Sequence, residues 1–168
     1  MKVLSIVRSG EPAGTRTHGP RLKRANRAFT PSINSPRDFS YAVEIRNVGL
    51  LGPEYRQVLD AHGVAYVYNH WSYMPSLVEQ HHRMERFTAS FTVLRLLTPL
   101  KMSYAAAKKR AEPYTKIVEE LPQMRREAVQ LARQAASEGR HAYVLVNNRA
   151  EGNAPLTVQA LTELLSKE

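Results

Sequence analysis

Two charged residues placed two positions apart are the first candidates for chemistry in this chain of 168 residues. Glu44 and Arg46 lie in an alternating run over residues 41–46, and alternate residues of a strand share one face. Val43 and Ile45 would face covering helices, which leaves both charges on the inner face of a sheet. A buried charge is costly unless it is paired. Arg95, in the apolar run 91–97, is the natural partner for the carboxylate.

This charged cluster has two interpretations. In the functional one, the three residues form an acid/base or anion-binding site, which Asn147 or Asn148 joins from the end of the last predicted strand. Polar side chains at the C-terminal ends of parallel strands are commonly site residues. In the structural one, the charges form an ion pair that fills the inside of the fold. The sequence leaves both interpretations open.

The loop behind the last predicted strand is a candidate phosphate site. Glu151, Gly152 and Asn153 stand between an apolar run and Pro155, which opens a helix. A helix N-terminus attracts anions, and a glycine lets the backbone approach an anion closely. One glycine is a weak signal, so the alternative is a plain connection in which Asn153 helps to cap the helix.

Other polar residues give weaker signals. Asn69 and His70 follow the second predicted strand, and with Trp71 they could line the rim of a ligand site. Glu79 and His82 have the spacing of di-iron ligands, but the second copy that such a site needs is missing. The sequence therefore predicts no metal site, and it points to no particular cofactor.

Alternating strands and helices must position these residues. Strands are predicted at residues 41–46, 64–68, 91–97 and 142–147. Helices are predicted from Pro53 to a cap at Gly63, over residues 75–86, from Leu121 to a cap at Gly139, and from Pro155 onward. Strands separated by helices cannot be hairpins, so they must be parallel with right-handed crossovers. The predicted class is α/β, with four parallel βα units.

Residues 1–35 differ in composition from the predicted domain at 36–168. Glycine and proline recur in this segment and interrupt any helix or strand, so we expect a disordered lead-in. Basic residues outnumber acidic ones there and supply most of the net charge of +9. A basic arm that contacts phosphates and an organelle transit peptide are the two alternatives.

Composition also excludes several classes of function. Cysteine is absent, which excludes disulfides, thiol nucleophiles and zinc sites built on cysteine. No apolar run reaches the roughly 18 residues of a membrane helix, so we expect no membrane partner and a cytoplasmic location. Phe29 alone interleaves the basic segment with an aromatic ring, so base stacking has little support and we do not expect a nucleic-acid partner.

Three motifs resemble the YecE-like family, whose members are TIM barrels of unknown function. The motifs are the run 41–47, Arg95 in the third strand, and the segment 147–155 with its Asn-Asn, Glu-Gly and Ala-Pro pairs. The resemblance extends from about Pro36 to Leu165. It implies that the four strands are the fifth to eighth of an eight-stranded barrel.

The chain also departs from the family pattern at two places. Leu96, Leu97 and Thr98 follow Arg95, where the family commonly has His-Gly. Arg149 stands where a shorter or acidic residue is usual. Both departures weaken the transfer of any site from the family.

The resemblance implies half a TIM barrel, because a full one takes roughly 250 residues. We expect a truncated derivative with a vestigial small-ligand or phosphate site at the C-terminal rim of the strands. Half a barrel would leave two unpaired sheet edges. The alternative is therefore an enzyme completed by a homodimer or by a complementary half-barrel. A third hypothesis is a nucleic-acid-associated protein that acts through the basic segment.

Overall fold

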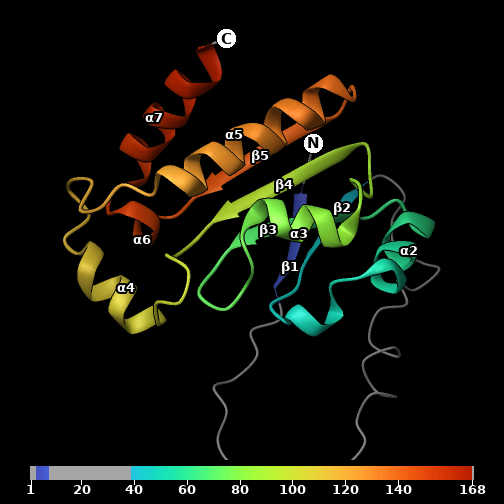
Figure 1. Cartoon of the computed structure of the whole chain (residues 1–168), viewed down its shortest axis with the longest axis horizontal. Helices are drawn as coiled ribbons and strands as arrows, with labels where there is room; N and C mark the ends of the chain where they lie inside the picture. The colour runs from blue at the N-terminus through green and yellow to red at the C-terminus, as the bar shows by residue number, and fades with distance from the viewer. Residues whose placement is uncertain (1–2, 8–38, 168) are drawn as a thin grey trace, which may run out of the picture.

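The computed structural model describes residues 3–7 and 39–167, where parallel strands alternate with helices (Figure 1). The strands are β1 (Val3–Val7), β2 (Ser40–Glu44), β3 (Ala65–His70), β4 (Phe91–Leu96) and β5 (His141–Val146). The helices are η1 (Val48–Leu50), α2 (Pro53–Ala61), α3 (Leu77–Met84), α4 (Tyr104–Ala111), α5 (Pro122–Ser137), α6 (Asn148–Glu151) and α7 (Ala154–Ser166). The predicted α/β class with four parallel βα units is confirmed by β2 to β5.

The described strands form one parallel sheet in the order β1-β2-β3-β4-β5. Because every neighbouring pair is parallel, the C-terminal ends of the strands meet at one edge of the sheet. The register places Asn69 of β3 opposite Arg95 of β4, and Arg95 opposite Leu145 of β5. Residues paired in this way share a face, so these three side chains belong to one row near the C-terminal edge.

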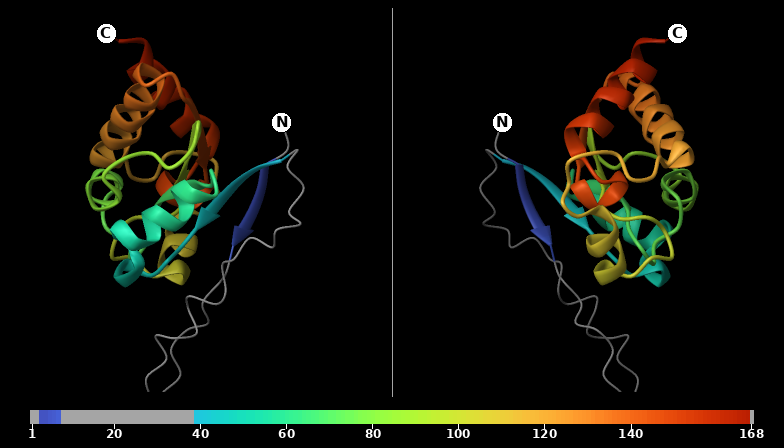
Figure 2. Two further views of the ribbon diagram at one scale, coloured as in Figure 1. Left: turned by 90° about the vertical axis from the view of Figure 1, so that its right-hand side faces the viewer. Right: turned by 90° about the vertical axis from the view of Figure 1, so that its left-hand side faces the viewer.

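Helices cover one face of the sheet and bury the larger apolar core against it. Figure 2 shows the helices gathered on one side of β1 and β2. Buried residues of the strands meet buried residues of α2, α3, α5 and α7 in this core, among them Tyr66, Tyr68, Leu94, Leu96, Leu59, Leu77, Met84, Met124, Leu131 and Leu161. The helical periodicity of the apolar residues explains why these helices dock with one stripe.

The other face of the sheet holds a smaller apolar cluster and then turns polar. Ala42, Ala65, Val67, Phe91 and Val93 are buried together on this face. Farther along the same strands, two positions on, lie Glu44, Asn69 and Arg95. Along β2, β3 and β4 this face therefore changes from apolar to polar, at the edge where a site in a parallel α/β fold is expected.

Local sequence signals set most of the helix ends. Proline occupies the first turn of α2, α5 and α7, where its missing N–H costs nothing. The hydroxyl of Ser76 accepts a hydrogen bond from the backbone of Glu79, and the hydroxyl of Ser103 accepts one from Ala106. Gly63 and Gly139 adopt positive φ angles of 60° and 71° just after α2 and α5, as predicted for C-terminal caps.

The structure differs from the sequence-based predictions in three places. Val3–Val7 form β1, which pairs in parallel with β2, so the prediction that no strand forms within residues 1–35 is wrong there. The rest of that predicted lead-in lies outside the described residues. Two helices, α4 and α6, were not predicted from the sequence.

Among residues 3–7 and 39–167, no helix has both the length and the apolar character needed to cross a bilayer.

Candidate functional site

A buried carboxylate held by two guanidinium groups forms the centre of the candidate site. The side chain of Glu44 has no exposed surface, and its Oε1 accepts a hydrogen bond from Arg46 Nε at 2.8 Å. Its Oε2 accepts a hydrogen bond from the NH1 group of Arg95. The structure thus brings together the three charged residues that the sequence placed in one cluster. Both carboxylate oxygens are engaged, which is the condition for keeping such a charge buried.

The two arginines remain open to solvent on their outer side. The side chains of Arg46 and Arg95 are 26% and 23% exposed. Beyond the bonds to Glu44, neither guanidinium donates a hydrogen bond to any residue that the structure describes. The cluster has two positive charges and one negative charge, so its solvent side presents a net positive charge with free N–H donors. Planar forks of this kind suit carboxylate and phosphate groups.

Trp71 supports one of these arginines. The guanidinium carbon of Arg46 lies 4.9 Å from the centre of the Trp71 ring, in cation–π contact. The ring of Trp71 in turn meets Tyr73 edge-on at 5.2 Å between ring centres. The aromatic residue that follows β3 therefore holds Arg46 in place at the rim, which is a more specific role than the lining of a ligand site considered from sequence.

Asn69 lies between the two arginines in the order of the strands. Its Nδ2 donates to the backbone oxygen of Ile45 at 2.9 Å, which ties β3 to the segment after β2. Its backbone N–H donates to Gln80 Oε1 at 3.1 Å, and its backbone oxygen accepts from Gln80 Nε2 at 2.8 Å. The position of Asn69 is thus fixed by both its side chain and its main chain.

Sequence reasoning did not identify Gln80, although a signal was available. Gln80 is completely buried on α3, together with the apolar residues Leu77 and Met84. A polar residue on the buried stripe of an amphipathic helix must have partners inside the fold. Gln80 finds them in the main chain of Asn69, the backbone oxygen of Pro75 and the hydroxyl of Tyr66.

His70 lies on the helix-covered side and does not join the arginines. Successive residues of a strand point to opposite faces, so His70 follows Tyr66 and Tyr68 rather than Asn69. Its Nδ1 donates to the backbone oxygen of Thr98 at 2.8 Å, because that carbonyl can only accept. Burial lowers the pKa of His70 below its ordinary value of 6.5, which favours the neutral ring in the folded protein.

Asn147 and Asn148 serve as local caps in this structure. Asn147 Oδ1 accepts from the backbone of Arg149 at 3.0 Å and starts α6. Asn148 Oδ1 accepts from the backbone of Ala154 at 2.8 Å at the start of α7. The structure does not bring either amide into contact with Glu44, so the part of the predicted cluster contributed by β5 is not assembled.

Glu151 is a buried tie between helices. Its side chain has no exposed surface and accepts hydrogen bonds from the backbone of Leu121 at 2.6 Å and from the Thr157 hydroxyl at 2.8 Å. Arg125 donates two further bonds to the same carboxylate, at 2.9 and 3.1 Å. These contacts hold α5, α6 and α7 together. A carboxylate with this many internal donors is fully engaged and faces no open space.

Gly152 and Asn153 also contact neighbouring segments of the fold. Gly152 has a φ angle of +119°, and a Cβ atom there would lie 2.4 Å from the backbone oxygen of Lys116 and 2.8 Å from the backbone nitrogen of Val118. Asn153 Oδ1 caps α7 by accepting from Leu156 at 3.0 Å, and its Nδ2 donates to the Tyr114 oxygen at 2.7 Å. The glycine makes room for the neighbouring chain segment, which matches the structural alternative considered for this loop.

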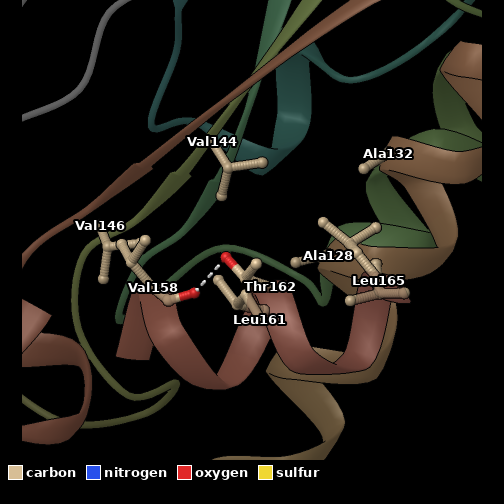
Figure 3. A pocket seen from close by; sticks show the side chains of 9 residues that line it. Ala128, Ala132, Val144, Val146, Val158, Leu161, Thr162 and Leu165 are labelled. Atoms are coloured by element: carbon tan, nitrogen blue, oxygen red, sulfur yellow. Dashed lines mark hydrogen bonds between the residues drawn. The ribbon is translucent and has the colours of Figure 1, made fainter. Parts of the chain in front are cut away.

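A cavity of about 100 Å³ lies away from the charged cluster, between α5, β5 and α7 (Figure 3). Apolar side chains of all three elements line it, including Ala128, Val144 and Leu161. Thr162 also lines it, but its hydroxyl donates to the backbone oxygen of Val158 at 3.0 Å. The cavity therefore offers a ligand little beyond apolar contact.

The described residues contain no group of three or more metal-ligating side chains close enough to share an ion. His81, beside the pair examined for iron-ligand spacing, is buried and bonded instead. The ring nitrogen Nδ1 of His81 lies 2.8 Å from the Tyr68 hydroxyl. Among the residues that the structure describes, the best-formed arrangement for chemistry is the Glu44–Arg46–Arg95 cluster.

Replacing Gly152 with alanine should destabilise the fold severely. The combination of positive φ with backbone contacts below 3.0 Å should cost at least about 3 kcal/mol in the free energy of unfolding. Gly139→Ala is the matched control, since its φ is also positive but its Cβ would meet open space, and it should cost only about 1 kcal/mol. Urea unfolding measures both. Equal losses of stability in the two variants would show that the close approach of Gly152 to the backbone of Lys116 and Val118 is unimportant.

His70 should make stability fall in mild acid. The unfolded chain takes up a proton near pH 6.5 that the buried ring resists, so stability is present above that pH and declines below it. We expect a smaller decline between pH 7.5 and pH 5.5 for His70→Gln, measured by urea unfolding. Exposed His62→Gln should keep the decline of the parent chain. An unchanged decline in His70→Gln would contradict this assignment.

Two solved DUF72 family proteins are similar in structure to this chain. The one from Thermotoga maritima has 19% identity and a TM-score of 0.51, and the match covers 77% of this chain and 47% of that protein. The one from Enterococcus faecalis has 14% identity and a TM-score of 0.56, with 79% and 49% covered. At such identities the likeness shows the fold alone, and this chain spans about half the length of either structure.

A search of curated proteins found no match. A family model described as "Protein of unknown function DUF72" matches residues 15–168, well over half of the chain. The YecE-like resemblance found in the sequence names the same family. The match begins before Pro36, where the sequence motifs begin, and after β1. The chain belongs to the DUF72 family.

Proposed function

We propose that this chain is a partial TIM barrel of the DUF72 family that binds a small organic anion at the C-terminal ends of its strands. Arg46 and Arg95 would hold the carboxylate or phosphate group of the ligand, and Glu44 would orient both guanidiniums. The observation that carries this proposal is a fully buried carboxylate paired with two arginines that keep free N–H donors on their solvent side.

Charge balance supports an anionic ligand. Glu44 neutralises one of the two arginines, and the remaining positive charge is held at an edge where ligands of α/β folds bind. An anion placed across both guanidiniums would complete the balance and accept several charge-assisted hydrogen bonds. The arginines need little reorganisation to do this, because Glu44 and Trp71 already restrict their positions.

The arrangement supports binding more directly than acid/base catalysis. Both oxygens of Glu44 accept hydrogen bonds from guanidinium groups, so the carboxylate is better placed to position arginines than to remove a proton. His70, which has a perturbed pKa, belongs to the opposite face of β3. Fold alone would not supply a reaction. The vestigial small-ligand site expected from sequence is therefore proposed here as a binding site.

Replacing Arg95 with glutamine tests the anion site. Isothermal titration with phosphate and with acetate should give millimolar binding to the parent chain, and Arg95→Gln should weaken it about tenfold or more. Arg83→Gln is the matched control. Arg83 is 41% exposed on α3 and pairs with Glu79 rather than with Glu44. Binding that Arg95→Gln and Arg83→Gln weaken equally would reflect general charge attraction and would refute the site.

A second candidate is that two copies of the chain associate through β5 to complete the active form. The sequence of β5 is apolar, yet it pairs with β4 alone among the described strands, and Leu145 is 51% exposed. Neighbouring α7 exposes Val158 and Leu165, which line the apolar cavity. An apolar edge of this kind is a template for pairing with another sheet. The solved relatives, of which this chain covers only about half, have room for further βα units.

Leu145→Lys should disrupt this association. We expect light scattering to give a dimer mass for the parent chain and a monomer mass for Leu145→Lys, because a charge on the paired edge opposes strand pairing. Val58→Lys, at a similarly exposed apolar residue of α2, should remain dimeric. A monomeric parent chain would exclude the second copy and leave a separate half-barrel as the partner.

Binding to nucleic acid through the basic segment concerns residues outside the described part of the chain.

A further inference from the structure

A third polar group completes a row with the two arginines. Asn69 lies opposite Arg95 in the β3–β4 register, and its side chain reaches the backbone of Ile45, the residue before Arg46. Arg46, Asn69 and Arg95 therefore occupy three adjacent strands or strand extensions at one level. All three follow the buried apolar cluster of the inner face. A ligand held by the arginines would therefore lie at the level of Asn69 on the strand between them.

The side-chain oxygen of Asn69 has an unmet hydrogen bond. Asn69 is completely buried, and its Oδ1 accepts no hydrogen bond from any residue that the structure describes. An interior acceptor without a donor is unfavourable, and buried polar groups almost always have partners. This acceptor, on the strand between the two arginines, is the feature that a ligand could satisfy.

The orientation of the Asn69 amide is determined by its surroundings. Nδ2 donates to the Ile45 backbone oxygen at 2.9 Å, and a weaker contact reaches the Val67 backbone oxygen at 3.5 Å. Exchanging the two amide atoms would place Oδ1 against these two acceptors, which would repel it. Gln80 holds the main chain of Asn69 on both sides. Oδ1 is therefore a fixed acceptor and requires a donor from elsewhere.

We propose that the ligand carries a hydroxyl or amino group next to its anionic group, as small hydroxy acids and their phosphate analogues do. The anionic group would lie across Arg46 and Arg95, and the adjacent O–H or N–H would donate to Asn69 Oδ1. This inference rests on the anion site proposed above and adds a specificity-determining residue to it. A site that requires such a donor rejects analogues lacking it far more strongly than it would by size alone.

Matched ligand pairs test this inference. Lactate and propionate have the same charge and nearly the same size, and they differ in one hydroxyl group next to the carboxylate. 2-Hydroxypropyl phosphate and propyl phosphate make the corresponding phosphate pair, which also differs in one hydroxyl group, so the two pairs separate carboxylate from phosphate ligands. By isothermal titration, the hydroxylated member of the preferred pair should bind about tenfold more tightly to the parent chain.

Asn69→Ala should remove this discrimination. We expect the ratio between the affinities for the two members of the pair to fall to about one. Arg95→Gln should weaken both members together. A thermal unfolding scan tests whether Asn69→Ala is folded. If the variant is unfolded, the ratio of the two affinities measured for the parent chain still tests the proposal.

The outcomes separate the two proposals. If none of the four compounds binds, the anion site itself is refuted. If anions bind but the paired compounds bind equally well to the parent chain, the anion site stands and the role of Asn69 is refuted. Retention of the full ratio in folded Asn69→Ala would also overturn the role of Asn69.

Discussion

A carboxylate that has lost all contact with solvent constrains the architecture of this chain. Glu44 can stay buried in that position only because guanidinium groups engage both of its oxygens. One comes from the segment just after β2 and the other from β4, with β3 between them. Of the two ion pairs, the one between Arg95 and Glu44 therefore links alternate strands across the inner face. Both ion pairs also determine where free N–H donors point, since the two arginines cannot move away without leaving a buried charge.

The two faces of the sheet divide the tasks of folding and recognition. The helix-covered face buries aromatic and aliphatic side chains, and its polar residues, such as Gln80 and His81, find partners inside the core. The opposite face is apolar through Val67 and Val93 and becomes polar at Asn69 and Arg95. Because β3 is buried on both faces, a polar residue there is unfavourable unless its polar atoms are hydrogen-bonded.

Sequence reasoning predicted the four βα units and the central cluster because both follow from short-range periodicity. Alternation places Glu44 and Arg46 on one face, and the need to pair a buried charge selects Arg95. Long-range contacts were less accessible. Nothing in the composition of residues 1–35 shows that Val3–Val7 pair with β2. The polar residues after β5 looked like ligands because only the structure reveals that caps and helix contacts use them, as for Glu151.

The most direct test of this account is a double-mutant cycle on Glu44→Gln and Arg95→Gln, measured by urea unfolding. If Glu44 depends on its guanidinium partners, the pair should show a coupling free energy of about 1–3 kcal/mol. The exposed pair Glu79 and Arg83 provides the reference cycle, with an expected coupling of about 0.5 kcal/mol or less. Equal coupling in the two cycles would contradict the account, because Glu44 would then not require Arg95 to remain buried.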